Sequence, residues 1–352
     1  MKKSLIALAA LAAVGAASAQ SSVTLYGRLD LGSSYNKTTT TVGGASTSVK
    51  TTSLAGAQGV RTGGRLGVRG TEDLGGGLKV NFNVETAVNP DRSTSGGFGT
   101  FGLTRTAILQ LQGAFGSVTI GTYLNVLDDV RGYSAATAGV AGGDFLVNTH
   151  ALSGLSGRSQ NSIGYRSPVF GGGFQAMIGT THEKTDTGVV ATTTKSTGYL
   201  GGVGYNNGPV SAILSAGQGK GQAGAVDAKI NDWGFAASYN LGMAVPYFQY
   251  EHSKLTSNLG AAATVKTNAW EIGSKFPMGA FTPYITASRG KVKVGSPEVV
   301  IKASAYQLGT TYDLSKRTYV YAAVGRDKNK TDVAGGVEVK RTGYALGLVH
   351  NF

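Results

Sequence analysis

Hydrophobic and polar residues alternate with a period of two along several segments of the chain. The segment 23–32 places Val, Gly and Leu residues at odd positions, whereas its even positions include Tyr26, Arg28 and Asp30. The segments 65–69 and 78–85 alternate in the same way, and at 344–352 bulky residues oppose mainly small ones. Because successive side chains of a strand point to opposite faces, the pattern predicts strands with one face suited to lipid and one to water. The segment 317–326 is apolar on both sides, so its faces stay unassigned.

The connections between these segments alternate between short and long. Short turn-like clusters are centred near residues 76, 115, 172, 207, 241, 278 and 315. Longer segments rich in Thr, Ser, Gly and Lys lie at 33–61, 90–102, 125–158, 184–197, 219–229, 254–265, 291–302 and 327–339. Seven turns and eight loops join sixteen strands. Strict alternation of short and long connections favours an up-and-down antiparallel transmembrane β-barrel over a propeller or a solenoid. The predicted fold class is therefore all-β.

The first nineteen residues have the layout of a secretory signal. Lys2 and Lys3 precede an apolar stretch that ends at the small-residue site Ala17-Ser18-Ala19. This layout predicts cleavage after Ala19, so that residues 1–19 are removed and residues 20–352 form a single barrel domain. A retained anchor helix is the alternative, but the apolar stretch is shorter than the roughly 20 residues that a membrane span requires.

Composition excludes several classes of protein. The 352 residues include 55 glycines, which disfavour helices, and no cysteine, which removes disulfides and thiolate chemistry. The formal charge is +13, or +11 once Lys2 and Lys3 are removed. An exported chain without a nucleic-acid-binding motif is not expected to bind nucleic acid, despite this charge.

Six segments carry a resemblance to a known family. They are Ser22–Arg28, Arg65–Lys79, Ala114–Gly121, Asn161–Pro168, Tyr312–Thr318 and Gly347–Phe352. In these segments the chain resembles the Gram-negative general porins, in particular the branch common in β-proteobacteria. The resemblance implies a sixteen-stranded barrel of the outer membrane, usually a homotrimer, whose third long loop folds inward to narrow the channel. One interval between turns, of 57 residues, is unusually long and contains that loop, which is expected at residues 125–157.

The resemblance also implies an arc of basic wall residues that faces acidic groups on the inward loop. On the water-facing positions these wall residues are Arg28, Arg65, Arg69 and Arg158, and the loop acids are Asp128, Asp129 and Asp144. An arginine facing lipid at mid-membrane would cost about 2–4 kcal/mol, which favours the lumen for all four. Two departures from the family weaken the match at the constriction. Thr122 stands where many relatives carry arginine, and the loop lacks their Pro-Glu-Phe sequence.

A passive, water-filled channel for small hydrophilic solutes is the predicted function, with anions preferred because arginines outnumber loop acids. Its expected partners are small anionic or neutral solutes, and outer-membrane lipid and lipopolysaccharide that exposed loop lysines could bind. Two alternatives stay open. One is a substrate-specific channel for phosphate or organic acids, and the other is a structural or adhesin barrel with a plugged lumen.

Enzyme chemistry has no support in the sequence. The four histidines are scattered without metal-ligand spacing, and no cofactor or metal site is expected. Two Gly-x-Gly-x-x-Gly matches, at 97–102 and 219–224, do not lie between a strand and a helix as a dinucleotide site requires.

Overall fold

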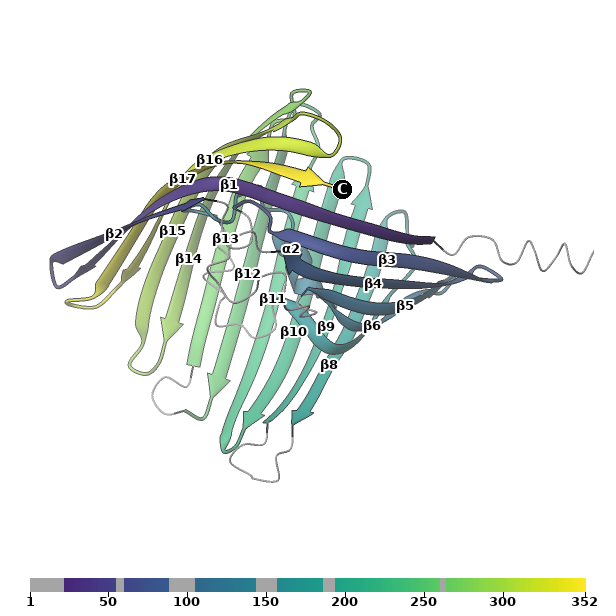
Figure 1. The fold of residues 1–352 in the computed structure, drawn as a ribbon. Coiled ribbons are helices and arrows are strands. Elements are labelled where there is room, and N and C mark those ends of the chain that lie inside the picture. The colour runs from purple at the N-terminus through teal and green to yellow at the C-terminus, as the bar shows by residue number, and fades with distance from the viewer. Residues whose placement is uncertain (1–21, 55–59, 89–104, 144–156, 186–193, 260–263) are drawn as a thin grey trace, which may run out of the picture.

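The computed structural model describes residues 22–54, 60–88, 105–143, 157–185, 194–259 and 264–352. Within these ranges seventeen strands form one antiparallel sheet that closes into a barrel (Figure 1). The strands are β1 (Ser22–Val42), β2 (Ala45–Leu54), β3 (Gly64–Gly75), β4 (Leu78–Val88), β5 (Thr106–Gly113), β6 (Gly116–Leu124), β7 (Arg158–Arg166), β8 (Phe174–Thr185), β9 (Thr194–Asn207), β10 (Val210–Ala223), β11 (Val226–Tyr239), β12 (Val245–Ser257), β13 (Thr264–Lys275), β14 (Phe281–Val294), β15 (Val299–Asp313), β16 (Thr318–Thr331) and β17 (Val337–Asn351).

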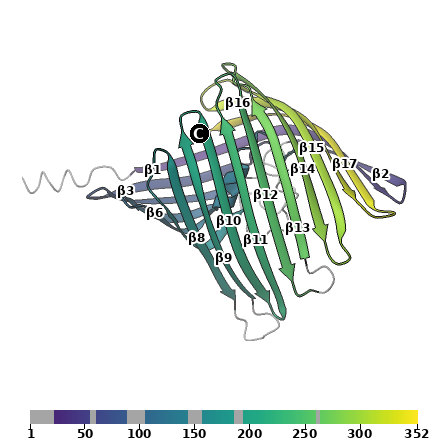
Figure 2. The ribbon, with the colours of Figure 1, turned by 180° about the vertical axis from the view of Figure 1, so that it is seen from behind.

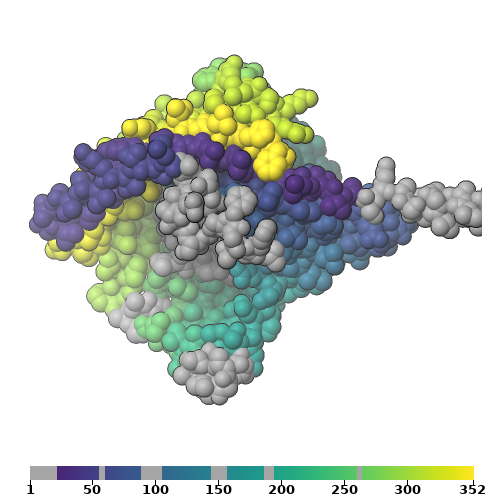
Figure 3. Space-filling model, viewed as in Figure 1, coloured from purple at the N-terminus to yellow at the C-terminus, as the bar shows by residue number. Residues whose placement is uncertain are grey.

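Sixteen of these strands form the ring, as predicted, and β2 is additional. The ring closes where residues 28–42 of β1 pair with residues 337–351 of β17. Residues 22–28 of β1 pair with β3, whereas residues 33–42 pair with β2, so that β2 continues the hairpin past the end of β3. The two ends of the described chain consequently lie side by side on one wall (Figure 3). The prediction of a loop at residues 33–61 is therefore wrong for the parts of that segment that belong to β1 and β2. The Thr- and Ser-rich sequence of these parts suits a hairpin that is exposed to water.

The predicted alternation of faces is confirmed. On β1, Leu25 is 62% exposed toward the outside, whereas Asp30 is 1% exposed and lies on the lumen side. The structure also assigns the faces of β16. Tyr321 is buried and its hydroxyl donates to Asp30 Oδ1 at 2.9 Å across the lumen face, while Val324 is 53% exposed on the outer face. Among the described helices, none has the length and apolar character needed to cross a membrane.

The strands from β9 onward are longer than the ten residues expected. They contain 12 to 15 residues. At about 3.3 Å per residue they reach about 40–50 Å, which exceeds an apolar band of about 25 Å even with tilt. Figure 2 shows these strands projecting well past the shorter ones. Much of the expected loops 219–229, 254–265, 291–302 and 327–339 is therefore strand, since alternating Thr, Ser and Lys suit a strand with water on both faces.

Candidate pore constriction

The third long loop begins with a short helix inside the ring, α2 (Val126–Arg131) (Figure 1). The side chain of Asn125 caps this helix by accepting a hydrogen bond from the backbone N–H of Leu127 at 3.0 Å. Val126, Leu127 and Val130 are buried in an apolar cluster that includes barrel-wall residues. The helix was not expected, because six residues are too few to show a helical period.

Glycines on the lumen face form the seat of α2. A Cβ at Gly202 would lie 2.6 Å from the side chain of Val126, and one at Gly234 would lie 3.2 Å from that of Val130. Any larger residue at Gly202 would therefore push the helix away from the wall. These glycines lie on the inner face of β9 and β11. Glycines at lumen-facing positions of neighbouring strands are the sequence signal that could have indicated a helix packed there.

Charged groups hold the end of α2. Arg131 donates from Nε to Glu251 Oε1 and from Nη2 to Glu251 Oε2, both at 3.0 Å, which is a bidentate pair with β12. Arg131 also lies 3.5 Å from Asp128, whose Oδ2 accepts from the backbone N–H of Gly157 at 2.6 Å. Burial raises the pKa of Asp128 to about 6, although Arg131 and the Gly157 N–H favour its ionised form. Asp128 is thus a loop acid that can change charge near neutral pH.

The remainder of the described loop is tied to buried side chains of the wall. The backbone N–H of Thr137 donates to Gln307 Oε1 at 2.6 Å, and Gln307 Nε2 donates to the carbonyl oxygens of Thr137 and Ala141 at 3.1 and 3.3 Å. Further along, the N–H of Gly142 donates to Asp327 Oδ2 at 2.9 Å. Residues 125–143 therefore follow the inner wall from β9 to β16, and the predicted inward fold of the third loop is confirmed.

Basic residues gather on another part of the wall. Arg28, Arg105 and Arg158 all act electrostatically on Arg65. Glu85 on β4 lies among them: its Oε1 accepts from Arg105 Nε at 2.6 Å, and its Oε2 lies 3.9 Å from Arg65 Nη1. The structure thus brings together three of the four predicted arginines.

Sequence reasoning missed Arg105 and Glu85 as members of this group. Glu85 ends the alternating segment 78–85, and alternation alone indicates that its side chain faces water without indicating a role there. Arg105 lies directly before β5, between an expected loop and an expected strand, where no alternation marks its direction.

The other predicted site residues lie apart from this group. Arg69 lies four residues along β3 from Arg65, about 13 Å nearer the tight turns, where its guanidinium is 5.1 Å from the ring centroid of Tyr26. Asp129 lies 3.6 Å from Arg166, and both side chains are partly exposed. Asp144 lies outside the described residues.

A closed barrel with an apolar outer face, and with a loop folded into a charged lumen, defines a pore-forming protein of the outer membrane. Residues 6–332 match the family model described as Gram-negative porin, and the chain belongs to that family. Porins are passive channels, so the protein is an outer-membrane channel and not an enzyme.

Individual relatives agree with this assignment. The chain is 35% identical to outer membrane porin protein 32 of Delftia acidovorans and 29% identical to an outer membrane porin protein of Bordetella pertussis, over the full length of each. Its fold is similar to that of the anion-selective porin from Comamonas acidovorans, with a TM-score of 0.70 and 28% identity over 95% of this chain and all of that one.

Proposed function

We propose that the channel prefers anions and that its constriction lies between the third loop and the arginine group. The observation that carries the proposal is the gathering of Arg28, Arg65, Arg105 and Arg158 around Glu85, the carboxylate that pairs with two of them. On the loop side, Arg131 lies between Asp128 and Glu251 and offsets part of their negative charge. A positive excess on the wall attracts anions, because charges in a confined pore are poorly screened.

Arg69 and Asp129, two other residues of the predicted site, have smaller roles in this proposal. Arg69 faces the same lumen below the arginine group and extends its positive potential toward the tight turns. Asp129 sits at the start of the loop beside Arg166. The relative solved from Comamonas acidovorans is described as anion-selective, which supports the same preference here.

Reversal potentials in a planar bilayer test the proposal. With a potassium chloride gradient across a single channel, we expect the potential to have the sign of chloride preference, and the preference to weaken at high salt as screening increases. Equal permeability for both ions would refute it. The absence of step currents would indicate a plugged barrel, and saturable block by phosphate or an organic acid would indicate a substrate-specific channel.

Acidification is expected to strengthen the anion preference. Asp128 has a pKa of about 6, so it is mainly ionised at pH 7 and mainly neutral at pH 5. Burial also raises the pKa of Asp129, which therefore acts in the same direction. Loss of one negative charge about 10 Å from the permeating ions changes the energies of an anion and of a cation by about 0.4 kcal/mol in opposite directions, or roughly fourfold in the permeability ratio. Reversal potentials recorded from pH 7 to pH 5 check this.

The variant Asp128→Asn serves as the control for that titration. It should show the acid-form preference already at pH 7 and a smaller change on acidification. A response to pH as large in the variant as in the original chain would assign the titration to other groups.

Processing and assembly complete the proposal. Cleavage after Ala19, a single barrel domain over 20–352, a constriction loop at 125–157 and a homotrimer follow from the signal layout and from family resemblance. Small anionic and neutral solutes would be its permeants, and outer-membrane lipid and lipopolysaccharide would surround it. N-terminal sequencing of the mature protein should begin at Gln20, and cross-linking in membranes should give trimers.

A further inference from the structure

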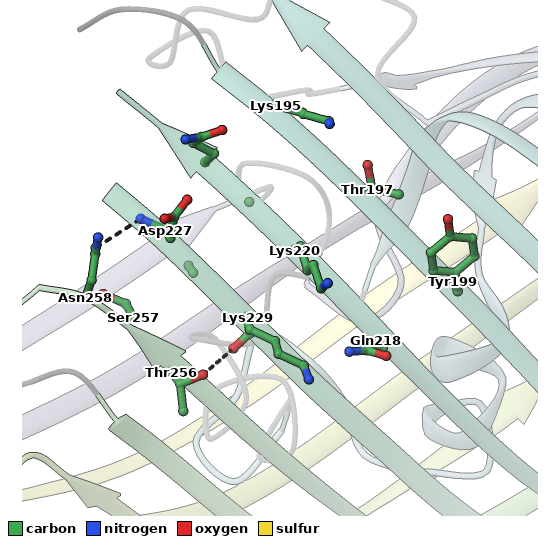
Figure 4. A pocket seen from close by; sticks show the side chains of 13 residues that line it. Lys195, Thr197, Tyr199, Gln218, Lys220, Asp227, Lys229, Thr256, Ser257 and Asn258 are labelled. Atoms are coloured by element: carbon green, nitrogen blue, oxygen red, sulfur yellow. Dashed lines mark hydrogen bonds between the residues drawn. The ribbon is translucent and has the colours of Figure 1, made fainter. Parts of the chain in front are cut away.

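A cavity of about 760 Å³ lies on the outer face of the barrel, across strands β9 to β12 (Figure 4). Three lysines from neighbouring strands line it, Lys195, Lys220 and Lys229, together with polar residues that include Thr197, Gln218, Thr256 and Asn258. Lys220 has the same parity on β10 as Leu214, which is 54% exposed, whereas Ser215 of the opposite parity is 1% exposed. The cavity therefore faces away from the lumen and takes no part in the channel.

The positive charge of this cavity exceeds the negative charge of its own residues. Lys220 and Lys229 are directly opposite each other across β10 and β11. Like charges directly opposite destabilise a sheet, and an anion bound between them would relieve the repulsion by Coulomb attraction. Among the residues that the structure describes, no ion pair engages any of the three lysines. One carboxylate, that of Asp227, lies at the edge of the cavity, opposite Gln222 rather than between the lysines.

The residues at the lower edge of the cavity and beneath it belong to the membrane surface. Tyr199, two residues below Thr197 on β9, is 63% exposed, and Trp233 on β11 is 42% exposed. Lower on the same faces, Val203 and Phe235 are exposed apolar residues. Aromatic residues at this level mark the interface between the acyl chains and the headgroups. A ligand that contacts both levels must carry acyl chains below and an anionic, hydroxyl-rich head above.

A second cationic patch further round the barrel differs in one respect. Lys291, Lys302 and Lys330 are also opposite one another on β14 to β16. Lys302, however, is paired with Asp332 at 2.7 Å, so that patch supplies part of its own counter-charge. The three lysines that line the cavity on β9 to β12 have no such ion pair among the described residues, and the cavity gives an external anion room to lie between them.

We propose that this cavity binds the phosphorylated sugar headgroup of lipopolysaccharide. Lys220 and Lys229 hold one phosphate between them, Lys195 contacts a second anionic group, and the Thr, Gln and Asn side chains donate to sugar hydroxyls. The acyl chains then lie against Tyr199 and the apolar residues below it. This inference rests on the outer-membrane location of the barrel and not on the anion preference of its lumen.

Binding of lipid A to the purified full-length channel in detergent tests this inference. The original chain should bind bisphosphorylated lipid A, should bind the enzymatically dephosphorylated lipid much more weakly, and should not lose the lipid to millimolar inorganic phosphate. The double variant Lys220→Gln, Lys229→Gln should bind about tenfold or more weakly, because each lysine near a phosphate surface contributes substantially. Removing two opposed like charges should not weaken the fold, so unfolding by heat provides the check on integrity.

Two further variants make the result decisive. Lys220→Glu should form a cross-strand ion pair with Lys229, which keeps the barrel stable while lipid binding falls. A matched change of Lys316→Gln and Arg317→Gln, in the turn at the opposite rim, should leave lipid binding unchanged. Equal lipid A binding by the cavity variants and the original chain would overturn the site, as would equal binding of the dephosphorylated lipid. Reversal potentials should be the same in all of these variants, so this test and that of anion preference fail independently.

Discussion

Exchanging Arg28 and Arg158 together for glutamate is expected to convert the channel from anion to cation preference. These two arginines are chosen because both act on Arg65 while neither is in a described ion pair: Arg28 Nε donates to Asn351 Oδ1 at 2.7 Å, and Arg158 Nε has no partner. The exchange alters the wall by four charges. At about 10 Å in water each charge changes the energies of an anion and of a cation by about 0.4 kcal/mol in opposite directions, so four charges should change the permeability ratio by about 200-fold before salt screening is counted.

The reversal potential in a salt gradient measures this change, recorded near 0.1 M and near 1 M salt. Screening should reduce the effect at high salt, where the Debye length falls from about 10 Å to about 3 Å. Lys316→Glu with Arg317→Glu is the control, since it alters the net charge equally at an exposed turn far from the arginine group. If the wall variant and the turn variant give the same potential, the constriction does not lie at these arginines.

The barrel was predictable from sequence because a strand that separates lipid from water must alternate. Leu25 and Asp30 show this, since their faces follow from parity alone and the structure places them accordingly. Strand ends were not predictable in the same way. Above the membrane both faces of the sheet meet water, so Lys220 and Lys229 give the same pattern in a strand as in a loop. Only their pairing across β10 and β11 reveals that they lie in a wall.

The constriction was predictable only in part, for a different physical reason. Parity places Arg65 and Arg69 on the same face but does not say which of them lies level with the other arginines, and the register with β1 places Arg65 opposite Arg28. Arg105 became visible only through its 2.6 Å contact with Glu85, which joins residues of two strands. The helix α2 depends on glycines of β9 to β11 that leave room for it. In each case the missing information is a contact between distant parts of the chain.

Replacing Gln307 with leucine is expected to release the middle of the third loop while the barrel stays closed. Gln307 is 1% exposed, and its side chain is hydrogen-bonded to the backbone of Thr137 and Ala141. Leucine fills a similar volume but leaves the Thr137 N–H and the Ala141 carbonyl without described partners, at a cost of about 1–3 kcal/mol each, and leaves the Thr137 carbonyl only its longer bond from the Val140 N–H at 3.4 Å. The loop should therefore leave the wall part of the time. Single-channel recording should show larger current fluctuations and an altered mean conductance.

Gln249→Leu is the matched control, because it makes the same substitution on the same inner wall at the same 1% exposure. The Oε1 atom of Gln249 has no hydrogen-bond partner in the described structure, so leucine there removes an unsatisfied polar atom and leaves the bonds of Gln307 to the loop intact. This variant should be as stable as the original chain or more so, with unchanged current. If both variants alter the current equally, the effect arises from the wall and not from the tether. If neither does, the hydrogen bonds of Gln307 do not hold the loop in place.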